Sequence, residues 1–201
     1  MKIMYMLNRF FGRKKETSPP DMKDVFRGAG CFKVPESVYN GYPAPLPSAP
    51  PLAAYFIRFL VSENGLDMFF HVLVKLGYKM ELDLNTQILT RSGERGSKKV
   101  MLFLHPSFAG MVISLASDDF DVIATLQQKR FEPPLPSESF PSIDPGGLGS
   151  LQGDMEYWWV NFWFPFWQAL SLERQSALDL VPEWREFILM HQQYEPEIPP
   201  G

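Results

Sequence analysis

The distribution of apolar and polar residues predicts one long aromatic helix near the C-terminus. Residues 155–170 read MEYWWVNFWFPFWQAL, and four of the five tryptophans of the chain lie there. The apolar positions follow the spacing i, i+3, i+4, i+7, which places them on one face of a helix. They are Met155, Trp158, Trp159, Phe162, Trp163, Phe166, Trp167 and Leu170. Asp154 can cap this helix, and Pro165, which lacks an amide hydrogen, predicts a kink or a break within it.

Earlier in the chain the apolar pattern changes from a helical to a strand period. Apolar faces with helical spacing at 52–60 and 66–73, separated by Gly65, predict an αα-hairpin that ends at Gly77. Alternation of apolar and polar residues and short polar connections then predict an antiparallel meander. Its strands are expected over residues 78–84, 88–90, 100–104 and 111–116. The sequence His105-Pro106-Ser107 predicts a turn between the last two strands.

The remaining patterns complete an α+β fold. Residues 119–130 have helical spacing, although a fifth strand is the competing interpretation. Residues 131–153, rich in Pro, Gly and Ser, predict a long loop, and a helix is expected over 172–180. A final helix is expected from Pro182 onward, with an apolar side made of Trp184, Phe187, Ile188 and His191. We therefore expect an antiparallel β-meander of about four strands packed against the N-terminal αα-hairpin and the C-terminal aromatic-rich helices.

The composition adds a division into an arm, one domain and a tail. Residues 1–51 carry a basic aromatic start and a proline-rich stretch over 42–51, which predicts an arm with polyproline II character. Residues 52–195 are expected to form a single α+β domain that includes the 131–153 loop, and residues 196–201 a tail. The first seven residues are too short for a signal-peptide core, and Cys31 is the one cysteine, so a cytoplasmic location is expected.

Charge divides the chain into two unlike halves. Residues 1–100 carry 15 Lys and Arg against 9 Asp and Glu, whereas residues 101–201 carry 4 against 14. The acidic C-terminal half favours a basic protein partner and argues against nucleic-acid binding, which needs a basic surface. Residues 100–116 are uncharged, but the proline at position 106 argues against a transmembrane segment.

Candidate chemistry is sparse, and the sequence predicts no catalytic residue, cofactor or metal site. His71 is expected to pack on its helix, His105 to precede a turn, and His191 to lie near a helix C-terminus. Residues 146–153 are rich in glycine but lack the lysine of a phosphate-binding loop. An enzyme stays possible, because a catalytic triad is defined by geometry and not by spacing.

The acidic residues and the aromatic stretch together predict a surface for a protein partner. Its acidic members would be Asp118, Asp119, Asp121, Asp154 and Glu156, and its aromatic members Tyr157, Trp159 and Phe164. Aromatic residues are enriched among the residues that dominate binding energy, and opposite charge accelerates association. The alternatives for Asp118, Asp119 and Asp121 are helix capping with solvated charge, or a metal site.

The acidic half, the many aromatic residues of 158–167 and the small α+β frame resemble the immunity proteins of bacterial toxin systems. The resemblance is one of class and covers about residues 52–195. It implies occlusion of a cognate toxin, often a nuclease, by an acidic aromatic surface. Two other classes compete with it. One is a viral matrix or structural assembly protein with a basic membrane-contacting arm, and the other is a small hydrolase whose site is not visible in the sequence.

Overall fold

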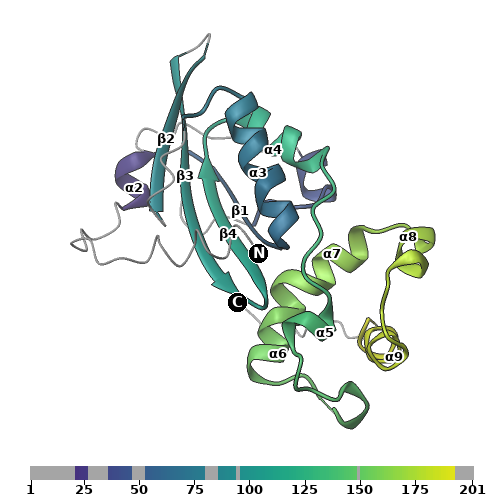
Figure 1. The fold of residues 1–201 in the computed structure, drawn as a ribbon. Helices are drawn as coiled ribbons and strands as arrows, with labels where there is room; N and C mark the ends of the chain where they lie inside the picture. The colour runs from purple at the N-terminus through teal and green to yellow at the C-terminus, as the bar shows by residue number, and fades with distance from the viewer. Residues whose placement is uncertain are drawn as a thin grey trace.

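A four-stranded antiparallel sheet forms the centre of the molecule in a computed structural model, which describes residues 21–26, 36–46, 53–79, 86–93, 96–148 and 150–192. Its strands lie in the order β1-β4-β3-β2, with helices on both sides (Figure 1). They are β1 (Tyr55–Val61), β2 (Thr86–Gly93), β3 (Gly96–Ser107) and β4 (Gly110–Ser117). The predicted α+β class and antiparallel sheet of four strands are confirmed.

The first strand of this sheet corrects the predicted αα-hairpin. Residues 55–61 form β1, which pairs with β4, and not a helix. Ile57 and Phe59 face one hydrophobic core, while Leu60 faces another on the opposite side of the sheet. A strand buried on both faces has no alternation of apolar and polar residues, so its apolar run also matched a helical spacing. Only the second helix of the predicted hairpin exists.

That helix, α3 (Glu63–Lys75), is capped by Ser62 and contains Gly65, which had been expected to separate two helices. A Cβ atom at Gly65 would lie 2.9 Å from Cβ of Val61, so glycine allows the helix to start directly against β1. Gly77 follows the helix with a φ of +90°, as its position predicted. Of the strand predicted over 78–84, Tyr78 and Lys79 are irregular and residues 80–84 lie outside the described residues.

The predicted turn at His105-Pro106-Ser107 is wrong by two residues. These residues belong to β3, and the chain reverses at Phe108 and Ala109, so that Ser107 pairs with Gly110. Phe108 and Ala109 have φ values of 52° and 58°, in the left-handed region that residues with a Cβ rarely adopt. Gly110 is required here because a Cβ atom would lie 2.4 Å from the carbonyl oxygen of Val61.

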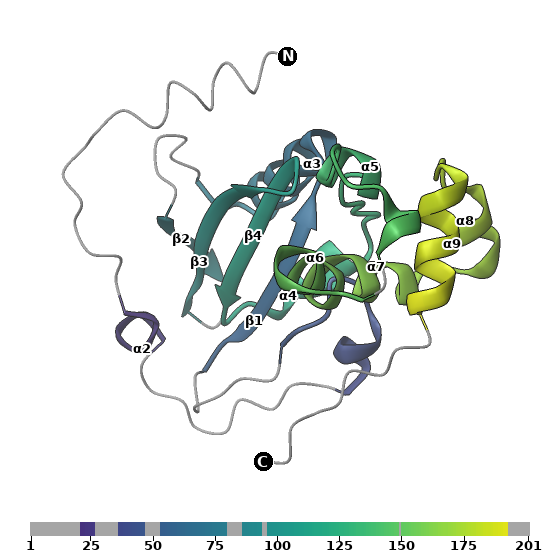
Figure 2. The same cartoon turned by 90° about the horizontal axis from the view of Figure 1, so that it is seen from below.

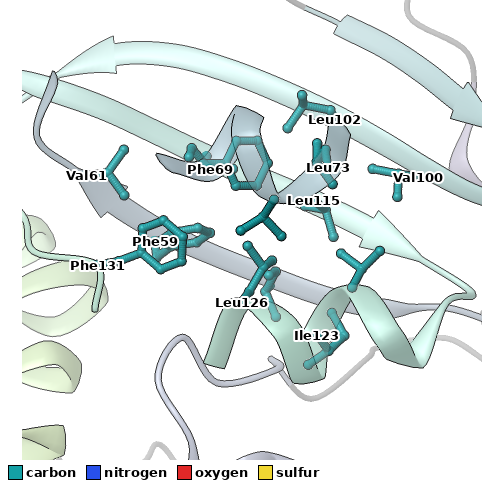
Figure 3. Close-up of a cluster of buried hydrophobic side chains, with 14 of the residues drawn as sticks. Phe59, Val61, Phe69, Leu73, Val100, Leu102, Leu115, Ile123, Leu126 and Phe131 are labelled. Carbon is teal, nitrogen blue, oxygen red and sulfur yellow. The ribbon is translucent and has the colours of Figure 1, made fainter. Parts of the chain in front are cut away.

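One face of the sheet is covered by α3 and by α4 (Phe120–Gln127), which confirms the helix predicted near 119–130. The buried side chains between them come from the sheet, both helices and Phe131 (Figure 3). Phe59 makes edge-to-face contacts with Phe69 of α3 and with Phe131, at ring-centre distances of 6.1 and 5.2 Å. This face is closed by apolar packing along most of the sheet.

The aromatic helix lies across the opposite face, over β1 and β4 (Figure 2). It consists of α6 (Gly153–Trp158), a π-helical turn η3 (Trp159–Trp163) and α7 (Phe164–Ala169). Its predicted apolar face is confirmed, because the four tryptophans and both phenylalanines of that face are buried against Leu60 and Val112. Each such aromatic side chain removes about 150–250 Å² from water, so this helix is a principal source of stability.

Of the kink or break predicted at Pro165, the break does not occur, and the irregularity is a π-helical turn just before the proline. Phe164 keeps helical angles, with φ −63° and ψ −45°, and its amide donates to the carbonyl of Trp159, five residues earlier. The chain therefore accommodates the missing amide of Pro165 through a wider turn just before it. This turn keeps the aromatic residues on both sides of Pro165 within one buried layer.

The loop predicted over 131–153 is described except for Gly149, and it contains α5 (Pro136–Ser139) and η2 (Pro145–Gly147). Phe140 anchors it through ring contacts with Trp158 and Trp184. The C-terminal helices follow as α8 (Leu172–Ala177), shorter than predicted, and α9 (Pro182–His191). The predicted buried side of α9 is confirmed, and its residues are Trp184, Phe187, Ile188 and His191.

Two described parts of the predicted arm contact the domain. They contain α2 (Met22–Val25) and η1 (Glu36–Asn40). Phe26 packs with Met101 and Ala116 on the same side of the sheet as the aromatic helix. Val38 belongs to the hydrophobic core that lies between the sheet and the helices α3 and α4. The basic cluster at residues 9–15 and residues 47–51 of the proline-rich stretch lie outside the described residues. No helix in the described part of the chain is long and apolar enough to cross a membrane.

Candidate functional site

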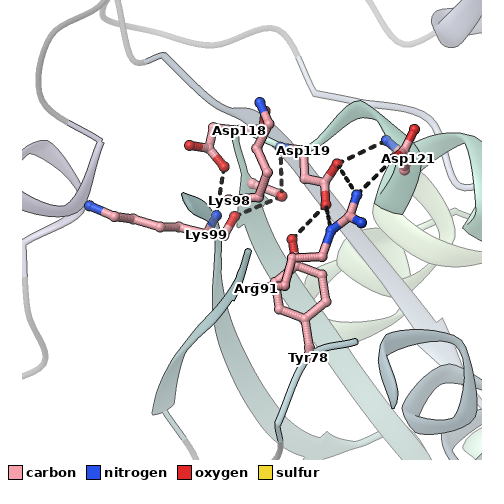
Figure 4. A network of polar contacts seen from close by, with 8 residues as sticks. Tyr78, Arg91, Lys98, Lys99, Asp118, Asp119 and Asp121 are labelled. Atoms are coloured by element: carbon pink, nitrogen blue, oxygen red, sulfur yellow. Dashed lines mark hydrogen bonds and ion pairs between the residues drawn. The ribbon is translucent and has the colours of Figure 1, made fainter. Parts of the chain in front are cut away.

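The acidic segment 118–121 connects β4 to α4, and Asp119 is its central residue. Asp119 is 2% exposed and caps α4 by accepting from the amide of Asp121. Arg91 of β2 donates to both of its carboxylate oxygens, at 2.6 and 2.9 Å, and the Tyr78 hydroxyl donates at 2.7 Å (Figure 4). Arg91 also donates to Asp121 at 2.7 Å. This bidentate pair links β2 to the start of α4.

The electrostatics of this network follow from its burial and its internal pairing. Burial alone would raise the pKa of Asp119, but the hydrogen bonds from Arg91 and Tyr78 and the charge of Arg91 hold it below its ordinary value. The hydrogen bonds to Asp119 raise the pKa of Arg91 despite burial. Burial, and then Asp119, raise the pKa of Tyr78. Asp119 is therefore a buried carboxylate that stays charged because its partners are in place.

Asp118 is bound in the same way on the other side of the segment. Its Oδ1 atom accepts from the Lys99 amide at 2.7 Å, and its backbone carbonyl accepts from Lys98 Nζ at 3.0 Å. The prediction that Asp118, Asp119 and Asp121 form a free acidic surface is therefore wrong for Asp119 and weakened for its neighbours. Asp119 caps α4, Arg91 pairs with Asp119 and Asp121, and the carboxylate of Asp118 is held by a backbone amide.

Two of the predicted aromatic anchors also lie in the interior. Trp159 is 1% exposed and stacks on Phe164, with ring centres 5.6 Å apart. Phe164 is half-buried against the same aromatic core. The expectation of an exposed Trp159 is wrong, because the wider helical turn and the packing of α9 bring it under Phe187. Tyr157, by contrast, is 39% exposed.

Asp154 and Glu156 lie exposed in the first turn of α6. The structure does not bring them together with the 118–121 segment. Tyr157 of α6 contacts Phe108, which precedes the first residue of β4, whereas Asp118 follows the last residue of that strand. A strand rises about 3.3 Å per residue, so most of the length of β4 separates the two acidic groups.

The C-terminal helices carry an exposed surface that the sequence analysis did not identify. Figures 1 and 2 both show α8 and α9 next to each other at the side of the molecule away from the sheet. We define the α8–α9 surface as the exposed residues Leu172, Glu173, Asp179, Val181, Glu183, Glu186, Leu189 and Met190. Leu172 is 81% exposed and Met190 62%. Glu183, Glu186 and Met190 follow the spacing i, i+3, i+7, and this outward stripe could have been read from the sequence.

The arginines near this surface are engaged within the molecule. Arg185 donates to the carbonyls of Gln175 and Leu178, at 3.2 and 2.7 Å, where it satisfies the end of α8. Arg174 forms an ion pair with Glu132. Arg174 is neutralised by Glu132, whereas Arg185 keeps its charge, so the four carboxylates of the α8–α9 surface are in excess and leave a net negative potential for a partner.

A cleft of about 450 Å³ adjoins this surface. Its charged lining consists of Glu132, Glu138, Asp179 and Arg174, so carboxylates outnumber cations. The side chain of a lysine or an arginine would suit this composition. A second cleft of about 500 Å³ opens beside Arg91, but the guanidinium of that residue is already bound by Asp119 and Asp121.

The histidines do not converge on a common site. His71 is exposed on α3, so the prediction that it packs is wrong, and His105 is exposed on β3. His191 is buried, with its Nδ1 atom 2.8 Å from the carbonyl oxygen of Phe187. Among the described residues, no group of three or more His, Cys, Asp or Glu side chains could hold a metal ion. Cys31 lies outside them.

Comparisons with known proteins add no relative from which a role could be carried over. No family model, no curated protein and no solved structure matches the chain.

Proposed function

We propose that this protein is a non-catalytic binding protein that neutralises a cognate toxin by covering a basic active-site cleft, as in a nuclease. The observation that carries the proposal is the α8–α9 surface. It exposes Leu172, Met190 and four carboxylates, while Arg174 is neutralised by Glu132. Exposed apolar side chains within an acidic rim are typical of a surface that binds a basic protein.

The cleft next to this surface supports the same proposal. Asp179 and Glu138 line it opposite the ion pair of Arg174 and Glu132. A basic side chain of the toxin would be attracted by the carboxylates, while Leu172 and Met190 would contact apolar groups around it. The acidic charge would mainly speed association, and the apolar contacts would slow dissociation.

The proposal is tested by co-expression with the product of the adjacent gene. We expect this protein to restore growth to cells that the neighbouring product inhibits, and the two purified proteins to elute as a stoichiometric complex. Absence of both growth rescue and complex formation would reject the proposed function.

Two charge-reversal variants test which surface binds. Glu183→Lys with Glu186→Lys changes the α8–α9 surface, and Asp154→Lys with Glu156→Lys changes the start of α6. Each pair raises the formal net charge from −4 to 0, so the two variants are matched in charge. The first removes one carboxylate from the first turn of its helix and the second removes two. We expect the first to slow association by on the order of tenfold at low salt and the second to leave it nearly unchanged. If the second variant slows association and the first does not, the partner binds at the start of α6.

A further inference from the structure

Arg58, in the middle of β1, has no partner that matches its charge. It is half-buried, and its Nε atom is buried without a hydrogen-bond acceptor. Its guanidinium carbon lies 5.5 Å from the ring centre of Tyr157 and 5.7 Å from that of Phe162. Within the described part of the chain, no carboxylate forms an ion pair with it. The guanidinium therefore lies beside two aromatic rings that contact each other, and its Nε donor is unpaired.

This arrangement is unusual for a guanidinium. An arginine has five N–H donors in the plane of the group and no acceptor, and buried donors in proteins are nearly always paired. An aromatic face attracts the positive charge but leaves the donors at the edge of the guanidinium without acceptors. The Nε atom is enclosed by the protein, whereas the two Nη atoms of Arg58 are not among the buried unpaired atoms, so the Nη donors are the ones that an acceptor from outside can reach.

The row of residues that crosses the sheet at Arg58 is half-buried along its length. The register places Arg58 opposite Ser114, Ser114 opposite Phe103, and Phe103 opposite Thr86, and all four side chains are half-buried. The row on one side, which contains Leu60 and Val112, is covered by the aromatic helix. The row on the other side, which contains Met101 and Ala116, is packed against Phe26.

This row combines hydroxyl groups with an apolar surface next to the cation of Arg58. Ser114 and Thr86 carry hydroxyls, Phe103 is a flat apolar surface, and Tyr157 stands at the margin with 39% of its area exposed. Lys99, on the same face, donates its Nζ atom to the carbonyl of Val25 and is thereby engaged. Arg58 thus provides the one described cation of the row, which matches a single negative charge.

We propose that Arg58, together with Ser114 and Tyr157, forms a carboxylate-binding site on the sheet. Arg58 donates to both carboxylate oxygens of the ligand, a hydroxyl from Ser114 or Tyr157 donates to one of them, and the body of the ligand lies along Phe103. A planar carboxylate fits the fork of a guanidinium and carries the one charge that Arg58 can balance. A phosphate dianion would need a second cation. This site is separate from the α8–α9 surface and does not depend on the proposed function.

The first experiment follows the side-chain Nε–Hε resonance of Arg58 by NMR during titration with benzoate. We expect saturable shifts with a dissociation constant on the order of 1 mM, which is typical of a small ligand held by few contacts. Benzamide, of the same shape but uncharged, should bind at least tenfold more weakly. An absence of saturable shifts, or equal binding of benzamide, would overturn the proposal.

Two further probes define the ligand. Inorganic phosphate that binds more tightly than benzoate through Arg58 would overturn the carboxylate assignment. The peptide Ac-Ala-Glu-Ala-NH2 distinguishes a free acid from a protein side chain as the source. Tighter binding of the peptide than of benzoate indicates an acidic protein segment, and weaker binding indicates a small acid.

The second experiment separates binding from folding. Arg58→Met keeps the length and apolar stem of the side chain and removes the unsatisfied donors, so we expect a urea midpoint equal to or above that of the unmodified protein. The same substitution should abolish the benzoate shifts of the Tyr157 ring resonances, and Arg58→Lys should weaken benzoate binding by at least tenfold. A clear loss of stability on Arg58→Met, or unchanged benzoate binding, would show that Arg58 serves the fold instead.

Discussion

Arg91 and Arg58 lie on opposite faces of one sheet and differ in almost every respect. Arg91 makes a bidentate contact with the buried Asp119, reaches Asp121 as well, and lies over the ring of Tyr78. Arg58 lies over Tyr157 and Phe162 with its Nε atom unsatisfied. Both arginines contact aromatic rings, but only Arg91 has carboxylates. The comparison shows that the charge of Arg91 stabilises the fold, whereas the charge of Arg58 has no counter-ion within the described part of the chain.

The difference follows from how each face of the sheet is covered. On the side of Arg91, α3 and α4 close a continuous apolar core, and the acidic segment 118–121 enters it with its counter-ion. On the side of Arg58, the aromatic helix and Phe26 cover different rows and leave one row half-buried. A charged side chain under a fully covered face of the sheet needs a counter-charge from the chain itself. A charged side chain in a half-buried row does not, because water or a ligand can reach it.

The largest effect is expected within the aromatic layer that borders Arg58. Trp159→Ala should destabilise the protein by about 3–5 kcal/mol, because it opens a cavity in a buried core. Tyr157→Ala, two residues earlier and exposed, should cost far less. Urea denaturation measures both. Equal losses would mean that Tyr157 is as much a part of the core as Trp159.

The next largest effect is expected at Arg91. Arg91→Met should destabilise the protein by about 3 kcal/mol, because it leaves Asp119 charged and buried without its counter-ion. The matched substitution Arg58→Met should cost nothing measurable. Chemical denaturation of the two variants side by side tests the comparison directly, and similar losses for both would remove the distinction between the two faces.

Lowering the pH should reduce the free energy of unfolding through loss of the Arg91–Asp119 ion pair. The pKa of Asp119 is lower in the folded protein than in the unfolded chain, where it is about 3.9. Its contribution to stability is therefore fully present above that value and is lost as the pH falls through the folded pKa. Asp119→Asn should flatten this part of the profile of unfolding free energy against pH. Asp118→Asn is the control, and an equally flattened profile there would contradict the assignment to Asp119.

The smallest effect, with the opposite sign, is expected at the turn whose Phe108 ring packs on Tyr157. Ala109 has a φ of 58° and is exposed, so Ala109→Gly should stabilise the protein by about 0.5–1 kcal/mol through relief of left-handed strain. A rise in the thermal midpoint would show it. An unchanged or lower thermal midpoint would contradict the strain at Ala109, and unchanged binding of benzoate would show that this strain does not contribute to the site at Arg58.

The sequence by itself determined much of the architecture. Helical spacing identified the aromatic face from Met155 to Leu170 and the buried side of α9, because a surface helix must hide one face. Short connections and alternation predicted the antiparallel sheet, although β1 was mistaken for a helix. That error arose because Phe59 and Leu60 are buried on opposite faces, which removes the alternation that marks a strand.

Only the tertiary structure determined which charged residues of the predicted site are buried and paired. The sequence cannot show that Arg91, 28 residues before Asp119, would fold against it and turn a predicted acidic surface into a buried ion pair. It also cannot show that Arg58 would find two aromatic rings and no carboxylate. Charge belongs to the sequence, but whether a charge is paired depends on which strands and helices become neighbours, and those contacts form only when the chain folds.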